Sequence, residues 1–364
     1  MRRNPPKPAG GGNLLRNSYI CIPKHKTVMD ESRDEVCSGP AAEAVLSLSE
    51  IKSWARAEGF DLCGAARSEP VTACREAFDR WLAKGCDAGM EYMRRNEGVR
   101  FDPAELVPGA RTVIVCAVSY RSDISLGQLG SPAPRVASYA CCRDYHKVLK
   151  KMLRRLLGRI TEAFPGVSGR CFTDSAPLLE KWWASQAGIG CVGRNSLIIT
   201  PQWGSFVVLG EVVVDIAADR YDKPLEWEPC GSCTLCMKSC PNGAILPGRT
   251  IDARRCISRL TVESGGPAAE EVPTCGWIFG CDICQAVCPR NRTAPLHVNG
   301  AFDPLFDPRV LDGEHWLSLD DERFRTLCGT TPMARAGLER IRRTVATAGG
   351  CGASPDMGSG EKNE

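Results

Sequence analysis

Four cysteines with short, fixed spacing constrain this chain more than any other feature of its sequence. They form the run Cys230-x2-Cys233-x2-Cys236-x3-Cys240, and Pro241 follows directly. Two-residue spacers allow the first three sulfurs to converge on the corners of one iron–sulfur cube, and the proline turns the chain so that the fourth cysteine faces elsewhere. The run therefore predicts a 4Fe-4S cluster with three of these thiolates as ligands and a second cluster reached by the fourth.

A partner motif lies further along the chain. Cys281-x2-Cys284-x3-Cys288 also ends in a proline, Pro289, and Cys256 is the candidate for its missing ligand. Crossed ligation, as in bacterial-type two-cluster ferredoxins, gives each cluster four cysteines: Cys230, Cys233, Cys236 and Cys288 for the first, and Cys240, Cys256, Cys281 and Cys284 for the second. Zinc bound by two separate CxxC pairs is the alternative, but eight ligands in this order with both Cys-Pro endings favour clusters.

The cysteine count indicates the compartment. The 364 residues include 21 cysteines, an odd number, with no secretory signal, which is typical of a reducing compartment such as the cytoplasm. The net charge is only +3, so a general nucleic-acid-binding protein is not indicated, although a local basic face can still bind RNA. No apolar run approaches about 18 residues, so no membrane span is expected.

The rest of the chain divides by composition. Residues 1–42 are rich in Pro and Gly and predict a disordered tail rather than a transit peptide. Alternating periodicities then predict an α/β (α+β) domain over 43–224, a double 4Fe-4S ferredoxin-like module over 225–299, and a C-terminal helical segment with a polar tail over 300–364.

Within the first domain, individual elements are expected at defined places. Helices are predicted over 43–58, 73–84, 144–164 and from Pro177 to near Gly188, and strands over 111–119, 171–174, 196–200 and 206–215. Asp144 is the expected N-cap of the third helix, and His146 is interpreted as an ordinary helix residue. A further helix is expected over 332–348. No strand is followed by GxGxxG and there is no P-loop, so the sequence contains no motif for binding a nicotinamide cofactor or ATP.

Several segments resemble one family of enzymes. They are ArgAspTyrHis (143–146), PheThrAspSerAlaProLeuLeuGlu (172–180), AlaGlyIleGlyCysValGlyArgAsnSer (187–196), GlySerPhe (204–206) and AspAlaArgArgCysIleSer (252–258). Together with the cysteine framework they resemble epoxyqueuosine reductases over residues 45–300, and ArgArgThrVal (342–345) is similar to the last motif of that family.

This resemblance implies a cobalamin-dependent oxidoreductase, related in architecture to reductive dehalogenases, with cobalamin between the first domain and the ferredoxin module. Such enzymes reduce the epoxide of epoxyqueuosine at the tRNA wobble position to give queuosine. The matching proton donor is Asp174, whose pKa an apolar pocket would raise. A helix cap for the segment beginning near Pro177 is its alternative role.

The resemblance also implies binding residues. The matching cobalamin contacts, besides Asp174, are Arg100, Ala137, Ile198, Ile199, Thr200, Leu209, Ser258, Asp282 and Ile283. Lys181 and Arg194 are the expected contacts to the tRNA anticodon backbone, and the basic face of helix 144–164 is a further candidate: Lys147, Lys150, Lys151, Arg154, Arg155 and Arg159. The chain departs from many relatives at Ser138 and Lys181, where they have Arg, and at 275–277.

Two other functions compete with this one. A reductase of a small molecule, such as an organohalide, would share both cofactors, and a non-enzymatic electron carrier would bind no cobalamin. For the reductase, the expected partners are tRNA bearing epoxyqueuosine in its anticodon loop and an external low-potential electron donor. One chain supplies both clusters and the pocket, so a monomer in the cytoplasm is expected.

Overall fold

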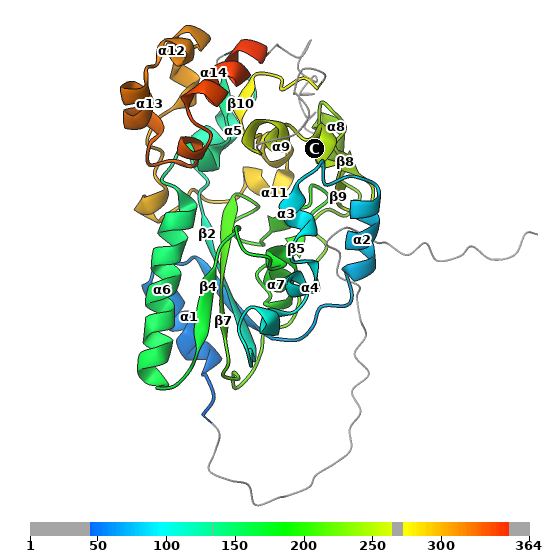
Figure 1. Ribbon diagram of the computed structural model, residues 1–364, viewed down its shortest axis with the longest axis vertical. Helices are drawn as coiled ribbons and strands as arrows, with labels where there is room; N and C mark the ends of the chain where they lie inside the picture. Colours follow the sequence, from blue (N-terminus) through cyan, green and yellow to red (C-terminus); the bar gives the residue numbers. More distant parts are fainter. Residues whose placement is uncertain (1–43, 133, 264–271, 349–364) are drawn as a thin grey trace, which may run out of the picture.

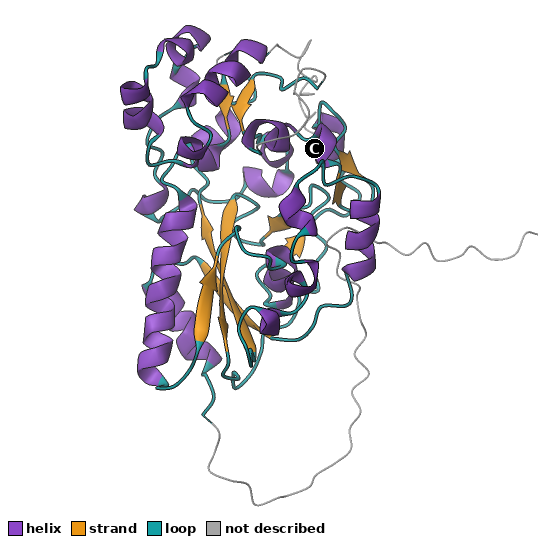
Figure 2. Cartoon of the chain, viewed as in Figure 1, coloured by secondary structure: helices purple, strands orange, loops and turns teal. Residues whose placement is uncertain are grey.

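A four-stranded antiparallel sheet lies at the centre of the molecule. The computed structural model describes residues 44–132, 134–263 and 272–348. The strands follow the order β1-β2-β7-β4, with bounds Leu62–Arg67, Thr112–Ser119, Val207–Val214 and Gly169–Phe172. All three pairings are antiparallel, so the predicted class is realised in its α+β form (Figures 1 and 2).

Helices cover both faces of this sheet. α1 (Leu48–Ala57) and α6 (Tyr145–Ala163) pack on one face, and α2 (Arg75–Ala83) and α7 (Glu180–Gln186) pack on the other (Figure 1). In α6 the buried residues recur every three or four positions: Leu149, Met152, Leu153, Leu156 and Ile160. This stripe packs on the sheet, and it holds the N-terminus of α6 near the end of the strands.

The cysteine-rich module consists of short elements. Its helices are α8 (Leu235–Ser239), α9 (Ile257–Val262), α10 (Ile283–Ala286) and α11 (Pro289–Arg292), and its hairpin is formed by β8 (Ile245–Leu246) and β9 (Thr250–Ile251). α8 packs against α10, which brings the two cysteine motifs together.

The C-terminal segment forms a separate core with two distant pieces of chain. α12 (Gly313–Ser318), α13 (Asp321–Cys328) and α14 (Leu338–Thr347) pack around a parallel pair made by β3 (Arg135–Val136) and β10 (Trp277–Phe279). The segment around β3 therefore leaves the central sheet and joins the C-terminal helices, which no local sequence pattern indicates.

Some sequence-based bounds are wrong. The helix expected over 332–348 is a 3-10 turn (Pro332–Arg335) followed by α14, because Gly337 takes a left-handed conformation (φ 76°) between them. The helix expected from Pro177 begins only at Glu180. The strand expected over 196–200 shortens to β6 (Ile198–Ile199), paired with β5 (Cys191–Val192).

Strand β1 is not predicted by any local sequence pattern. Its sequence, LeuCysGlyAlaAlaArg, contains no β-branched or aromatic residue, so its strand propensity is weak. Gly64 in its middle is required by packing, since a Cβ there would lie 2.0 Å from the carbonyl oxygen of Ala187. The remaining short helices are α3 (Glu91–Arg94), α4 (Glu97–Arg100) and α5 (Ile124–Gly127). None of the described helices has the length and apolar character of a membrane span.

Candidate redox and proton-transfer site

The first predicted set of cysteines lines one cavity. Cys230, Cys233, Cys236 and Cys288 all border a cavity of about 530 Å³, and no cysteine of the second set does. Burial raises the pKa of the Cys236 thiol to about 11, with further contributions from Cys230, Cys288 and Cys233. The predicted grouping of the first set therefore appears in the fold, across the two motifs.

The second set is grouped in the same way. Burial raises the pKa of Cys284, and the neighbouring thiols Cys256 and Cys240 raise it further. Burial also raises the pKa of the Cys281 thiol, and the neighbouring thiols Cys284 and Cys256 raise it further. No cluster of His, Cys, Asp or Glu among the described residues has the compact geometry of a single-ion site. A cube of four irons holds its thiolates farther apart than one ion does.

Backbone amides donate hydrogen bonds to one sulfur in each set. The amide of Arg194 donates to Sγ of Cys230, and the amide of Ala244 donates to Sγ of Cys240, both at 3.3 Å. Hydrogen bonds to ligand sulfurs stabilise negative charge and so raise a cluster's reduction potential. The donor sets and their surroundings therefore fit two iron–sulfur clusters.

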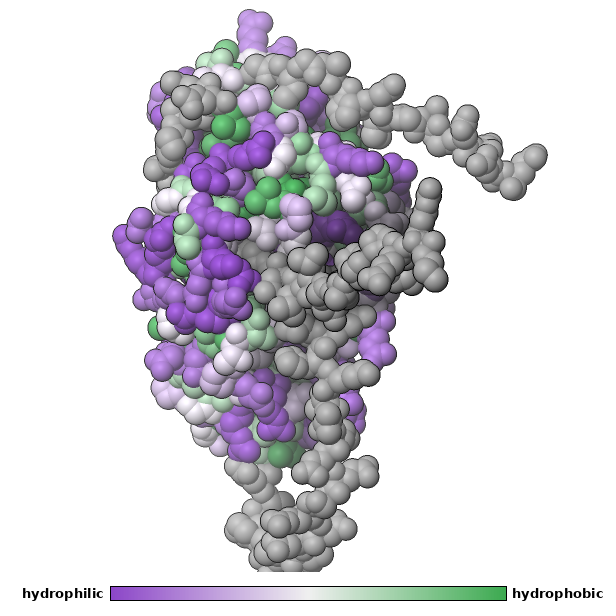
Figure 3. Space-filling view, turned by 90° about the vertical axis from the view of Figure 1, so that its right-hand side faces the viewer, coloured by the Kyte–Doolittle hydropathy of each residue, from purple (hydrophilic) through white to green (hydrophobic). Residues whose placement is uncertain are grey.

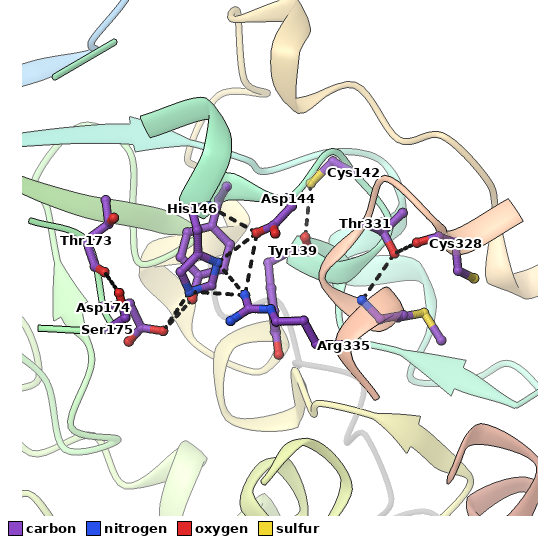
Figure 4. Close-up of polar contacts among 12 residues, drawn as sticks. Tyr139, Cys142, Asp144, His146, Thr173, Asp174, Ser175, Cys328, Thr331 and Arg335 are labelled. Atoms are coloured by element: carbon purple, nitrogen blue, oxygen red, sulfur yellow. Dashed lines mark hydrogen bonds and ion pairs between the residues drawn. The ribbon is translucent and has the colours of Figure 1, made fainter. Parts of the chain in front are cut away.

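Asp174 lies in the loop between β4 and α7, at the end of the central sheet. Its Oδ2 accepts a hydrogen bond from the Tyr145 hydroxyl at 2.8 Å and lies 3.2 Å from Nε2 of His146 (Figure 4). Its backbone has φ 46°, a left-handed conformation that Asp tolerates better than most residues, and its amide donates to Glu180. Tyr145 and His146 thus hold the carboxylate, and Glu180 holds the backbone of the same residue.

Three expectations for Asp174 are not met by the protein alone: a raised pKa, a water-poor pocket and a helix-capping role. Burial does raise its pKa, but hydrogen bonds from His146 and Tyr145 outweigh that effect, so its pKa is lowered rather than raised. The side chain is also 58% exposed, so the water-poor pocket expected around it is not formed by protein alone. Nor does Asp174 cap a helix: α7 begins at Glu180 without any side-chain cap.

His146, interpreted from the sequence as an ordinary helix residue, is part of this site. Its Nδ1 lies 2.7 Å from Oδ1 of Asp144, which also caps α6 by accepting the His146 amide. Burial lowers its pKa, but the hydrogen bonds to Asp144 and Asp174 raise it more. Arg335 from the C-terminal segment lies beside the ring, 3.5 Å from the same Asp144 oxygen (Figure 4). The two carboxylates therefore favour the protonated form of His146.

Two glutamates lie near Asp174, Glu180 partly buried and Glu211 fully buried. Burial, and then the charge of Asp174, raise the pKa of Glu180 to about 8. Glu211 on β7 is 0% exposed, and within the described part of the chain neither of its carboxyl oxygens has a hydrogen-bond partner. Its pKa lies well above the ordinary value, mainly through burial. The lone acid in the apolar strand ValValLeuGlyGluValValVal was the signal for this residue.

Glu211→Gln is expected to change how stability depends on pH. Below the ordinary glutamate pKa of 4.5, Glu211 is protonated in the folded and unfolded chain, so it contributes no pH dependence. Above that pH the unfolded chain ionises and the folded chain does not, so wild-type stability falls, by about 1.4 kcal/mol per pH unit, until the raised folded pKa is passed. Gln removes this loss.

The measurement is the free energy of unfolding in urea between pH 4 and pH 8. The difference in favour of the Gln variant should be small at pH 4 and grow with pH. Glu105→Gln, on the surface, is the matched control and should show no such slope. A constant difference across the range would mean that Glu211 is ionised in the folded protein.

The predicted cobalamin contacts come from several elements. Ala137, Ile198, Ile199, Thr200 and Asp282 are at most 3% exposed, whereas Leu209, Ser258 and Ile283 are half-buried. Ala137 and Ile283 pack in one apolar cluster. Ile198 and Leu209 pack in another, the cluster between the sheet and helices α2 and α7. Arg100 is buried and donates to the Tyr92 carbonyl at 3.0 Å.

The chemistry of these residues fits a large organic cofactor. Partly exposed Leu209 and Ile283 offer apolar surface, and the buried Thr173 hydroxyl beside Asp174 has no hydrogen-bond partner among the described residues. The Asp282 carboxylate is already satisfied, because the amide and hydroxyl of Ser138 donate to it at 2.7 and 2.6 Å. Apolar contacts and an open hydroxyl suit a corrin ring with amide side chains.

The residues expected to contact tRNA have other partners in the structure. The Lys181 ammonium donates to the Ser196 carbonyl at 2.8 Å, and the Arg194 guanidinium donates to the Gly231 carbonyl at 2.8 Å. Both acceptors are neutral carbonyl groups, so neither of these contacts is an ion pair. Glu58, which follows α1, pairs with Arg155 and Arg159 of α6 at 2.5 and 2.8 Å, and this neutralises part of the predicted basic face.

Comparisons with known proteins agree with this site. Residues 229–291 match the family model for a 4Fe-4S double cluster binding domain, so the site defines a double-cluster iron–sulfur protein. Residues 100–175, which contain Asp174 and His146, match the model described as epoxyqueuosine reductase QueG, DUF1730.

Relatives with the same name cover most of the chain. An epoxyqueuosine reductase of Leadbetterella byssophila is 37% identical over 82% of this chain and 96% of its own length, and that of Pseudomonas aeruginosa is 39% identical over 84% and 85%. The chain belongs to the epoxyqueuosine reductase family. It is an oxidoreductase of tRNA queuosine synthesis, with two 4Fe-4S clusters and cobalamin as cofactors.

Solved structures show the same fold. An epoxyqueuosine reductase with a tRNA-Tyr epoxyqueuosine-modified stem loop superposes with a TM-score of 0.73 and 27% identity, covering 82% of this chain and 80% of that one. The Bacillus subtilis enzyme, with its catalytic aspartate loop swung out of the active site, gives 0.72 and 26% over the same shares.

Proposed function

We propose that this protein removes the epoxide oxygen of epoxyqueuosine at the tRNA wobble position, with Asp174 as the proton donor. The observation that carries the proposal is the contact of the Asp174 carboxylate with both Tyr145 and His146, next to a double-cluster module. The solved relatives support it, since one was obtained with an epoxyqueuosine-modified stem loop and another has its catalytic aspartate loop swung out of the active site.

The reaction sets the requirements for the site. Both carbon–oxygen bonds of the epoxide break, a carbon–carbon double bond forms, and the oxygen leaves as water, so two electrons and two protons are consumed. The two iron–sulfur clusters would deliver electrons one at a time at low potential. Bound cobalamin would supply a strongly reducing centre beside the substrate.

The protein's own residues supply one of the two protons, and solvent water supplies the other. The proton from the protein is shared among Oδ2 of Asp174, Nε2 of His146 and the Tyr145 hydroxyl, and it is delivered to the oxygen that leaves carbon. Asp144 and Arg335 fix the imidazole so that Nε2 faces Asp174. A bound substrate would displace water from the exposed carboxylate and raise its pKa, which favours proton donation.

Cationic side chains near the site would position the tRNA backbone. Lys181, Arg194 and the α6 side chains Lys147, Lys151 and Arg154 are proposed to contact phosphates. Such contacts make binding weaken steeply with salt. The competing function, reduction of a small molecule, requires no such dependence.

The test is turnover with a defined substrate. Protein loaded anaerobically with iron, sulfide and cobalamin is given a low-potential reductant and tRNA that carries epoxyqueuosine, and the nucleosides are read by mass spectrometry. We expect a product lighter by one oxygen atom, formed only when cobalamin is present. Fully loaded protein that leaves the nucleoside unchanged would support a small-molecule reductase instead.

A further inference from the structure

The two cluster positions differ in their access to the outside. The cavity of about 530 Å³ is bordered by all four cysteines of the first set and by none of the second. All eight cysteines are partly exposed, so the two sets differ in whether they border this cavity. An electron arriving from solvent therefore meets the first cluster before the second.

The rim of this cavity is positively charged. The Arg194 guanidinium donates to the Gly231 carbonyl at 2.8 Å, and the Arg290 guanidinium donates to the Pro229 carbonyl at 3.1 Å and stacks over Trp227. Among the described residues, neither arginine forms an ion pair with a carboxylate. Carbonyl partners orient these groups without cancelling their charge, so the rim attracts anions.

Two more side chains lie on α8, the helix that borders this cavity. Leu235 is 40% exposed on the cavity wall, and Lys238 is exposed one turn further along α8, two residues after Cys236. The rim's carboxylate, Glu228, is paired with Arg249 at 2.6 Å. α8 lies on the right of Figure 1, on the side of the molecule that faces the viewer in Figure 3.

We propose that this surface, formed by Leu235, Lys238 and Arg290 around the first cluster, binds a small acidic one-electron carrier protein. A cationic rim around an apolar contact suits such a partner, because opposite charge speeds the encounter and a small apolar centre allows rapid release. One electron passes from the reduced carrier to the oxidised cluster, the carrier is oxidised by one electron, and no bond or proton is exchanged.

The experiment measures cluster reduction, not tRNA turnover. Reduced flavodoxin, an acidic carrier, is mixed anaerobically with the loaded protein, and bleaching of the cluster absorbance gives a second-order rate constant. Lys238→Glu is expected to lower this constant about tenfold and to weaken flavodoxin binding in a calorimetric titration. Lys238→Arg should retain both, and rising salt should slow the wild type toward the Glu variant.

Matched measurements separate docking from damage. Arg323→Glu on α13, on another face of the molecule, carries the same charge change and should leave the rate and the binding unchanged. Iron content and reduction by dithionite should be equal in all variants. If Lys238→Glu accepts electrons and binds flavodoxin like the wild type, the surface is not the entry point. The proposal rests on the proposed reductase function, but failure of that function would appear separately, as absent tRNA turnover with dithionite.

Discussion

Asp174→Asn is expected to slow conversion of epoxyqueuosine-containing tRNA by about 10²–10⁴-fold, the usual contribution of a positioned general acid. Asn matches the shape of Asp and tolerates the left-handed backbone found at this position, so the loop should keep its conformation. Its amide can still accept a hydrogen bond from Tyr145, but it has no proton to give at neutral pH. The defect should therefore lie in kcat, with tRNA affinity nearly unchanged.

The measurement is single-turnover conversion under saturating reductant, with iron, cobalamin content and tRNA affinity determined on the same samples. Ser175→Ala provides the matched control, because it alters the neighbouring residue of the same loop and removes only a hydrogen bond to the Thr173 carbonyl. It should convert substrate at close to the wild-type rate. An Asn variant within a few-fold of wild type would transfer the proton-donor role to another group, with His146 the first candidate.

The sequence located Asp174 but not the chemistry around it. A motif identifies one residue, whereas the pKa of that residue depends on groups that the fold brings to it from elsewhere. Tyr145 and His146 come from the start of α6, and Arg335 comes from the C-terminal segment. Burial alone would raise the pKa of Asp174, and with these groups present its pKa is lowered.

The same reason explains the differences in the fold. Strong periodicity predicted α6 and β2 within a residue or two, because their buried faces are visible in the local sequence. β1 is a strand because it pairs with β2, not because of its own composition. The packing of β3 with β10 joins residues far apart in the chain, and only the three-dimensional structure reveals that contact.

The assignment of the eight cysteines to two clusters predicts which cluster each single Cys→Ala variant loses. Cys230→Ala and Cys288→Ala are expected to lose the same cluster, although the two residues belong to different motifs. Cys240→Ala and Cys284→Ala are expected to lose the other. Each variant should retain half of the iron, because four thiolates hold each cube and the remaining set stays intact. Alanine is preferred to serine because its side chain has no ligand atom.

Iron and sulfide content, together with the electron paramagnetic resonance spectrum of the reduced protein, distinguish the two clusters. The shared cavity argues for crossed ligation, because Cys288 borders it with Cys230, Cys233 and Cys236 while Cys240 does not. Uncrossed ligation would instead make the spectrum of Cys288→Ala match that of Cys284→Ala. The first cluster lies at the cationic rim, so Cys288→Ala should also abolish fast reduction by flavodoxin. Cys284→Ala should leave this first electron transfer in place and block only the electron transfer steps that follow it.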